Sequence, residues 1–277
     1  TLLTKAQTDG SVRVIVGLRL PRPFRPEGEL KQSAIEAQRQ AIQAAQQALI
    51  DSLAPYRPEV YARFQFIPYL ALRADESTLR AMVGSPLVTG ITEDAPLPPL
   101  LESSIPIIGA DNVWEAGYEG AGWAVAVLDT GVQWDHSFFG GSAASRVVSE
   151  ACYSNAGGGG AGVTLCPNGL ASQTTGHASD PTIANCLDGG TNICTHGTHV
   201  AGIVAGSGTA YSGVAKSASL IGVQVFTRFN SDATCGVGQS PCVLSYISDQ
   251  ILGLQRVYNL RGSYNIAAVN MSLGGGR

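Results

Sequence analysis

An aspartate follows one of the longest apolar runs of the sequence. Residues 123–128 read WAVAVL, and Asp129-Thr130-Gly131 comes directly after them. A continuous apolar run of this length predicts a strand buried on both faces of a parallel sheet. Open α/β sheets bind ligands at the carboxyl ends of their strands, which makes Asp129 a candidate catalytic carboxylate. A carboxylate that only caps the turn after the strand explains this motif equally well.

A histidine stands where a predicted helix begins, at residues 195–206, which read THGTHVAGIVAG. The helix dipole at this end disfavours a charged imidazolium, so His196 tends toward the neutral form that a general base needs. A buried structural histidine explains His196 at least as well when the residue is taken alone. His196 and His199 are three residues apart, but no His-Glu-x-x-His pattern occurs, and we predict no metal site.

Four motifs then occur in a fixed order. They are VLDTG at 127–131, HGTHVAGIVAG at 196–206, GVA at 213–215 and NMSLGG at 270–275. Together they resemble the subtilisin-like serine proteases over residues 103–277. The resemblance implies an α/β fold in which a parallel sheet is flanked by helices, and a triad in the order Asp, His, Ser.

The resemblance also implies roles for individual residues. Asp129 would orient the imidazole of His196, and His196 would take the proton of the serine. Ser272, Leu273 and Gly274 match the strand whose backbone pairs with an extended polypeptide substrate.

The nucleophile of the family is missing from the sequence. No Gly-Thr-Ser followed by Met and Ala occurs, nor does the later oxyanion asparagine. We therefore expect the chain to hold only the amino-terminal part of the catalytic domain, with the serine beyond Arg277. On this interpretation the chain alone cannot form an acyl-enzyme and is inactive.

The segment after Asp129 also departs from the family. Many relatives have His-Pro-Asp where this chain has His136-Ser137-Phe138, and their aspartate binds a structural calcium. We expect no cofactor to be required. A structural calcium ion stays an open alternative, but Phe138 stands at the position of the usual carboxylate ligand.

Composition divides the chain near residue 101. Residues 1–101 hold 21 charged residues, whereas residues 102–277 hold 17 charged residues, 29 of the 34 glycines and all six cysteines. A proline-rich stretch at 95–106 predicts a linker between two domains, residues 1–101 and 102–277. The formal net charge of −4 and the short apolar runs favour neither nucleic acid nor a membrane as a partner.

The first domain is predicted as a small α+β fold of the ferredoxin-like kind. Its expected order is β-α-β-β-α-β, with strands at 11–18, 61–66, 69–73 and 86–92. The helices are expected at 31–53 and between Asp75 and Gly84. It resembles the inhibitor-type propeptide of the family, which implies a folding chaperone that occupies the cleft of its own enzyme.

The second domain shows strands alternating with helices. Strands are expected at 219–226 and 266–271, and an amphipathic helix at 245–260, which predicts a parallel sheet. The glycine-rich stretch 137–192 is longer than in compact relatives. Loops of this length are usually functional or cross-linked.

The cysteines fall into three near pairs. We predict the sequential pairing Cys152–Cys166, Cys186–Cys194 and Cys235–Cys242, out of the 15 pairings that six cysteines allow. Disulfides imply an oxidising compartment, so we expect a secreted, monomeric protein whose signal peptide is not in this chain.

Two alternatives stay open beside the serine endopeptidase precursor. The first is a catalytically inactive relative that binds peptides. The second is an aspartic protease that uses Asp129, but such enzymes need two Asp-Thr-Gly motifs and the sequence has one.

Overall fold

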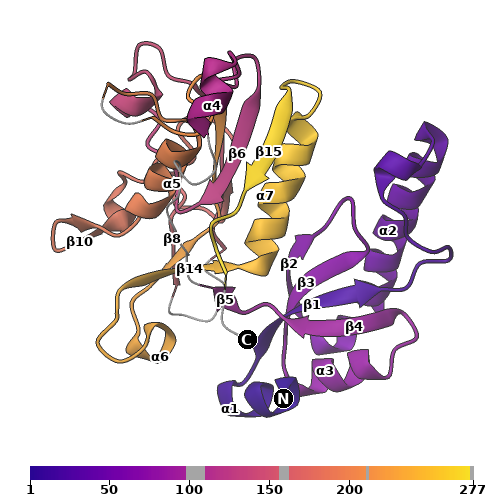
Figure 1. The fold of residues 1–277 in the computed structure, drawn as a ribbon. Coiled ribbons are helices and arrows are strands. Elements are labelled where there is room, and N and C mark those ends of the chain that lie inside the picture. Colours follow the sequence, from indigo (N-terminus) through magenta and orange to yellow (C-terminus); the bar gives the residue numbers. More distant parts are fainter. Residues whose placement is uncertain (98–109, 156–161, 210–211, 275–277) are drawn as a thin grey trace. The chain divides into compact units, whose positions relative to one another are not determined.

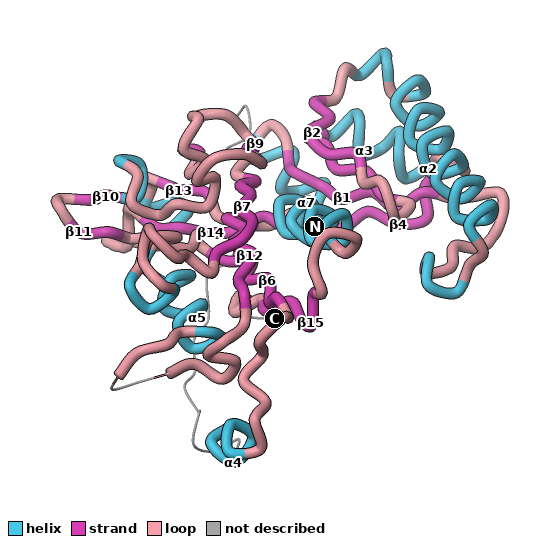
Figure 2. Tube along the Cα trace, turned by 90° about the horizontal axis from the view of Figure 1, so that it is seen from above, coloured by secondary structure: helices cyan, strands magenta, loops and turns pink. Residues whose placement is uncertain are grey.

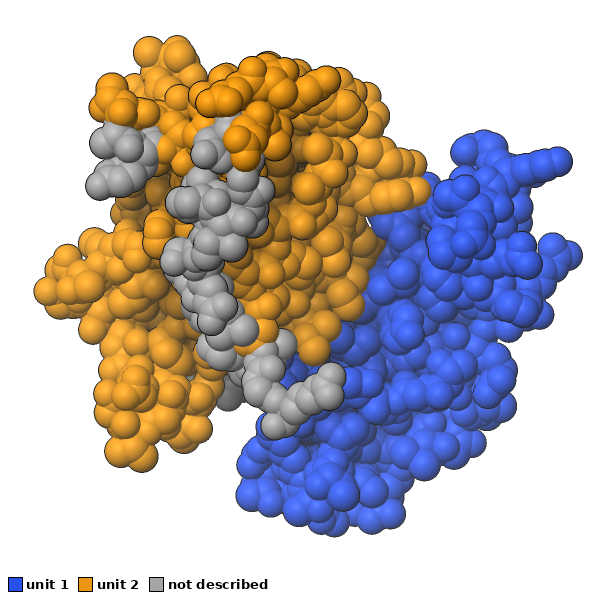
Figure 3. All heavy atoms as spheres, in the orientation of Figure 1, with its two compact units in different colours: residues 1–95 blue, residues 96–277 orange. Residues whose placement is uncertain are grey.

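The computed structural model describes residues 1–97, 110–155, 162–209 and 212–274. The chain divides into two compact units, residues 1–95 and residues 96–277 (Figure 3). The division lies six residues before the boundary expected from composition, since residues 96 and 97 pair with a strand of the second unit.

The first unit is a four-stranded antiparallel sheet with the strand order β2-β3-β1-β4. Its strands are β1 (Val12–Leu18), β2 (Glu59–Arg63), β3 (Tyr69–Ala74) and β4 (Val88–Glu93). The helices α2 (Gln32–Ser52) and α3 (Glu76–Val83) follow β1 and β3, which gives the predicted order of elements. The sequence analysis missed helix α1 (Leu2–Asp9) and placed β2 two residues too late.

The helices of this unit share one core with the sheet. Alternate residues of β1, from Val12 to Leu18, are buried together with Ala6 of α1, Leu49 of α2 and Met82 of α3. Helix α3 begins at Asp75, whose carboxylate accepts the backbone N–H of Thr78 at 2.7 Å, as the sequence predicted.

The main sheet of the second unit has the order β15-β6-β12-β7-β9. Its strands are β6 (Ala124–Asp129), β7 (Val147–Tyr153), β9 (Ser172–Gln173), β12 (Ser219–Gln224) and β15 (Ile266–Asn270). The first four in the spatial order run parallel and β9 is antiparallel. Strands β7, β12, β6 and β15 follow one another in this order in Figure 2.

Two helices cover opposite faces of this sheet (Figure 1). Helix α5 (Thr195–Ala205) packs on the face that carries Val127, and α7 (Ile247–Leu260) packs on the face that carries Ala126 and Leu128. Both helices lie where the sequence predicted helices. The alternation along β6 explains why this strand is apolar throughout.

A second, antiparallel sheet of this unit has the order β5-β14-β13-β8. Its strands are β5 (Pro96–Leu97), β8 (Gly162–Thr164), β13 (Thr227–Phe229) and β14 (Cys242–Tyr246). Shorter elements complete the unit: α4 (Ala110–Glu115), η4 (Ser137–Phe139), η5 (Ala184–Cys186), β10 (Leu187–Asp188), β11 (Thr191–Asn192) and α6 (Asp232–Cys235).

Disulfides cross-link the second unit, two of them in the stretch between Asp129 and His196. The structure joins Cys152 to Cys166, Cys186 to Cys194 and Cys235 to Cys242, which is the sequential pairing. Within the described residues, no helix is both long enough and apolar enough to span a bilayer.

Candidate active site

Asp129 is the last residue of β6, at the carboxyl end of the parallel sheet. Its side chain is fully buried, and its backbone carbonyl accepts the N–H of Val225 at 3.0 Å. Carboxylate Oδ1 accepts the N–H of Thr130 at 2.7 Å. The sheet and the following turn therefore fix both the backbone and the carboxylate of this residue.

His196 is the second residue of α5 and faces that carboxylate. Its Nδ1 lies 2.7 Å from Oδ1 of Asp129, and the imidazole is 15% exposed. Strand β6 and helix α5 thus bring together two residues that are 67 positions apart in the sequence.

The fit between β6 and α5 depends on Thr130 and Gly197. The Thr130 hydroxyl donates to the carbonyl of Cys194 at 2.9 Å and accepts the N–H of Gly197 at 2.9 Å. A Cβ on residue 197 would lie 2.9 Å from Cβ of Asp129 and would collide with the carbonyl oxygen of Gly131. Only glycine allows the helix to begin this close to the strand.

The far nitrogen of the imidazole, Nε2, is not used by the contact with Asp129. With Nδ1–H donating to Asp129, Nε2 is left with its lone pair and can act as a proton acceptor. Nε2 of His196 is buried and makes no hydrogen bond within the part of the chain that the structure describes. The pair therefore has the geometry of a general base held by a carboxylate.

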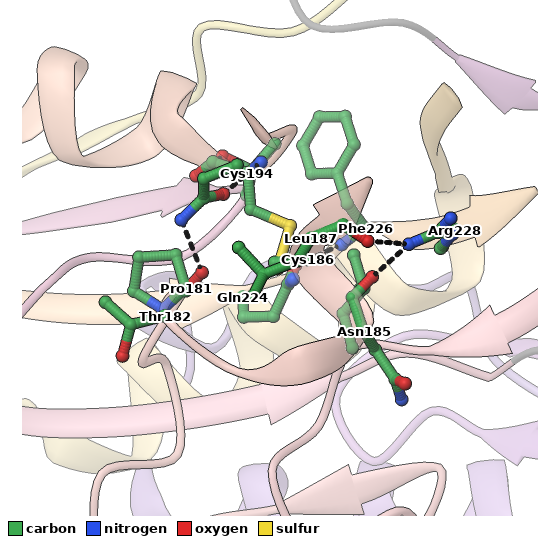
Figure 4. The surroundings of a disulfide bond; sticks show 12 residues. Pro181, Thr182, Asn185, Cys186, Leu187, Cys194, Gln224, Phe226 and Arg228 are labelled. Carbon is green, nitrogen blue, oxygen red and sulfur yellow. Dashed lines mark hydrogen bonds between the residues drawn. A yellow bond between two sulfur atoms is a disulfide. The ribbon is translucent and has the colours of Figure 1, made fainter. Parts of the chain in front are cut away.

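A disulfide anchors the chain just before α5 (Figure 4). Cys194 directly precedes the helix and is joined to Cys186. Asn192 accepts the N–H of Cys194 at 2.7 Å and donates to the carbonyl of Pro181 at 2.9 Å. On the other side, the Arg228 guanidinium donates to the carbonyls of residues 185 and 187. Hydrogen bonds and the disulfide thus hold the segment 185–194 that leads to His196.

The candidate substrate-binding residues follow β15. Ser272, Leu273 and Gly274 are half-buried, and Asn270 of β15 pairs with Val127 of β6. Because β6 and β15 are adjacent and parallel, Ser272–Gly274 leave the sheet at the same edge as Asp129. The structure thereby brings the candidate catalytic and substrate-binding residues to one end of the sheet.

The sequence analysis missed strand β14 of the second sheet. Strand β14 is antiparallel to β5, with Ser245 opposite Leu97 and Tyr246 opposite Pro96. We expected residue 245 to begin the helix, but α7 begins at residue 247. Residues 242 and 244 are half-buried, whereas 243, 245 and 246 are buried. The sequence CVLSY does not alternate between apolar and polar residues, so periodicity gave no signal for this strand.

Phe138 stands at the position where many relatives have a calcium-binding aspartate. The ring of Phe138 lies against α5, where a Cβ on Gly206 would lie 2.7 Å from Cε1 of that ring. The Arg146 guanidinium donates to the carbonyls of Phe138, Ala205 and Ala218. A positive side chain already binds these oxygens, and burial lowers its pKa. Among the described residues no three His, Cys, Asp or Glu side chains gather into a metal-binding group.

The sequence of the chain was compared with those of known protein families. The sequence profile of the subtilase family, Peptidase S8, matches residues 120–275. The chain therefore belongs to the subtilase family.

Individual relatives match over the same region. The chain is 33% identical over 144 residues to the minor extracellular protease Vpr of Bacillus subtilis, which covers 52% of this chain and 15% of that protein. It is 32% identical over 167 residues to the alkaline serine exoprotease A of Vibrio alginolyticus, covering 60% and 22%. It is 31% identical over 160 residues to the subtilisin-like serine protease AsES of Sarocladium strictum, covering 57% and 28%. The matches span less than a third of the length of these relatives.

A solved structure also resembles the chain. Fervidolysin from Fervidobacterium pennivorans, a keratinolytic enzyme related to subtilisin, aligns over 96% of this chain and 36% of its own, with a TM-score of 0.49 and 15% identity.

Proposed function

We propose that this chain is part of a secreted serine endopeptidase precursor that hydrolyses polypeptides with an Asp-His-Ser triad. Asp129 and His196 are two members of the triad in this proposal, and the serine lies beyond Arg277. The observation that supports it most directly is the 2.7 Å contact between Nδ1 of His196 and the buried carboxylate of Asp129.

Each residue has one task in the proposed reaction. Nε2 of His196 removes the proton of the serine hydroxyl as its oxygen attacks the substrate carbonyl. The buried Asp129 carboxylate holds the ring in the required tautomer and stabilises the imidazolium that forms. His196 then gives the proton to the leaving amine, and water repeats the sequence on the acyl-enzyme.

The first experiment tests the enzyme and the position of its nucleophile. A fluorophosphonate probe should label one serine of the full-length protein and leave the 277-residue chain unlabelled. In the full-length protein, His196→Ala should abolish labelling, whereas His199→Ala, an exposed histidine of the same helix, should retain it. A full-length protein without labelling would support the inactive peptide-binding relative instead.

The second part of the proposal concerns residues 1–101 as a propeptide that inhibits and helps to fold its own enzyme. It is supported by the antiparallel pairing of residues 96 and 97 with Ser245 and Tyr246, because a substrate can bind as an added strand in the same way. The strand that pairs with residues 96 and 97 is β14. Residues 98–101 and the cleavage region at 100–104 lie outside the described residues.

Two measurements test the propeptide. Amino-terminal sequencing of the secreted, full-length enzyme should find a start within residues 101–104. Residues 1–101 added in trans should inhibit that enzyme. The enzyme variant Ser245→Pro, which lacks the backbone N–H of that strand residue, should be inhibited less. A mature protein that begins near Thr1, or no inhibition at micromolar concentration, would contradict the proposal.

Secretion, a monomeric state and independence from calcium complete the proposal. Secretion is supported by the three disulfides, which persist in oxidising compartments. The guanidinium of Arg146 at the carbonyls of Phe138, Ala205 and Ala218 supports a domain that needs no calcium there.

A further inference from the structure

A buried carboxylate outside the proposed triad lies close to the turn that carries Asp129. Glu150 belongs to β7, and its side chain is only 7% exposed. Both of its oxygens are used. Oε1 accepts the hydroxyl of Ser179 at 2.9 Å and its N–H at 3.3 Å, and Oε2 lies 3.0 Å from Nδ1 of His177.

Ser179 connects this carboxylate to the turn after Asp129. Its carbonyl accepts the N–H of Val132 at 2.9 Å. The same carbonyl lies so close to Gly131 that a Cβ there would collide with it, and Gly131 has a φ of 109° that side chains rarely adopt. Residue 179 is fully buried. The backbone of the turn thus rests directly on Ser179.

Ser179 fits against the sheet because the residue beneath it is a glycine. Gly222 of β12 pairs with Val127 on one side and with Glu150 on the other. A Cβ on residue 222 would lie 2.5 Å from Oγ of Ser179. Ser179 therefore sits over the middle strand, between the strand of Glu150 and the strand that ends in Asp129.

The cost of burying Glu150 indicates that its contacts matter. Burial raises the pKa of this carboxyl group, and its bonds to His177 and Ser179 oppose that rise. The His177 ring stacks on Trp134 with ring centroids 3.8 Å apart, so the outer end of the network is also fixed. A buried carboxylate whose two oxygens both have hydrogen-bond partners is held in one position, so it can fix the residues that it contacts.

We propose that Glu150, acting through Ser179, is a positioning residue that fixes the Asp129 turn and thereby the contact between Asp129 and His196. A role for Glu150 in catalysis rests on the proposed function. The contact between Asp129 and His196 can be measured whether or not the protein is an active protease. When the support is removed, the turn relaxes, the bond from Nδ1–H to the carboxylate lengthens, and the carboxylate stabilises the imidazolium less.

The test uses proton NMR of the 277-residue chain. The Nδ1–H resonance of His196 is assigned by its loss in His196→Gln, and the pKa of His196 is followed by titration. We expect Ser179→Ala to move the resonance upfield and to lower the pKa of His196 by about 0.5 unit or more. Glu150→Gln should act in the same direction, and the double variant should add nothing to Ser179→Ala, since Glu150 acts through Ser179.

The matched control is Glu119→Gln, which removes the same charge from an exposed carboxylate that contacts Lys216 and Ser217. It should leave the His196 resonance unchanged. If Ser179→Ala lowers the melting temperature but leaves the resonance and the pKa of His196 unchanged, Ser179 is merely structural and the proposal is wrong. If Glu150→Gln does not fold, Ser179→Ala decides the question alone. Failure of the proposed protease activity would not affect either outcome.

Discussion

The two units of the chain are stabilised in different ways. Residues 1–95 contain no cysteine and 21 charged residues, whereas residues 96–277 contain 17 charged residues and three disulfides. The first unit buries an ion pair, in which Arg13 and Asp94 have side chains 5% and 0% exposed. The second unit uses glycines where backbones approach closely, as at Gly197 and Gly213.

The difference suits the proposed roles of the two units. A unit cross-linked by short disulfide loops loses less local order when it opens. The predictions below test this contrast, from the largest expected effect to the smallest.

Reduction should destabilise the second unit alone. Loops of this length contribute about 2 to 3 kcal/mol each, so loss of all three disulfides should cost about 7 kcal/mol. All three tryptophans lie in the second unit, so tryptophan fluorescence reports its unfolding, and hydrogen exchange of β1 reports the first unit. The control is the alkylating reagent without reductant. Equal loss of stability in both units would contradict the contrast.

Removal of the buried carboxylate should destabilise the first unit alone. Asp94→Ala takes away the anionic partner of the Arg13 guanidinium, and breaking a buried ion pair costs about 3 to 5 kcal/mol. Protection of the β1 amides should fall while the tryptophan transition stays in place. The neighbouring Glu93, half-buried and paired with Lys5, provides the control, and Glu93→Ala should cost less than about 1 kcal/mol. Similar losses for both variants would remove the distinction.

Arg146 should stabilise the second unit without calcium. Arg146→Met removes charged hydrogen bonds to three backbone carbonyls and should cost about 2 to 3 kcal/mol in the tryptophan transition. Calcium and a chelator should give the parent chain the same melting temperature. Arg261→Met, at an exposed arginine, is the control. A chelator that lowers the melting temperature of the parent chain would show a calcium site after all.

The cap of α3 should give the first unit a small pH dependence. The bond from the Thr78 N–H holds the pKa of Asp75 below its ordinary value. Its contribution to stability is therefore complete above the unfolded pKa and is lost as the pH falls through the folded pKa. Asp75→Ala should cost about 1 kcal/mol at neutral pH and progressively less in acid. A difference between variant and parent that does not change with pH would contradict this assignment.

Much of the site could be predicted from sequence because it is encoded locally. The apolar run before Asp129 and the small residues after His196 are short patterns, and each has a direct physical meaning. Two features had no such signal. Strand β5 forms by pairing with β14, which lies about 150 residues away in sequence, so no local pattern predicts it. Ser179 contacts the turn after Asp129, but it belongs to a long stretch without regular periodicity.

The predicted limits of an element were wrong where a turn interrupts the pattern of apolar residues. Strand β2 ends at Arg63, although apolar residues continue to Phe66. Helix α1 is short, and its apolar residues Leu2 and Leu3 become informative only when they pack on the core of the first unit. In both cases tertiary contacts, rather than local preference, set the limits of the element.

The β10–β11 hairpin offers a place to engineer the protein. Its tip, Gly189 and Gly190, is exposed and has positive φ, and the disulfide from Cys186 to Cys194 holds the two ends of the loop 5.5 Å apart. A foreign peptide inserted between the two glycines would lie in a loop whose base is closed by a covalent bond. The motion of the inserted residues would therefore not be transmitted to α5. A recognition sequence inserted there would end six positions before His196, without loosening the helix that carries this residue.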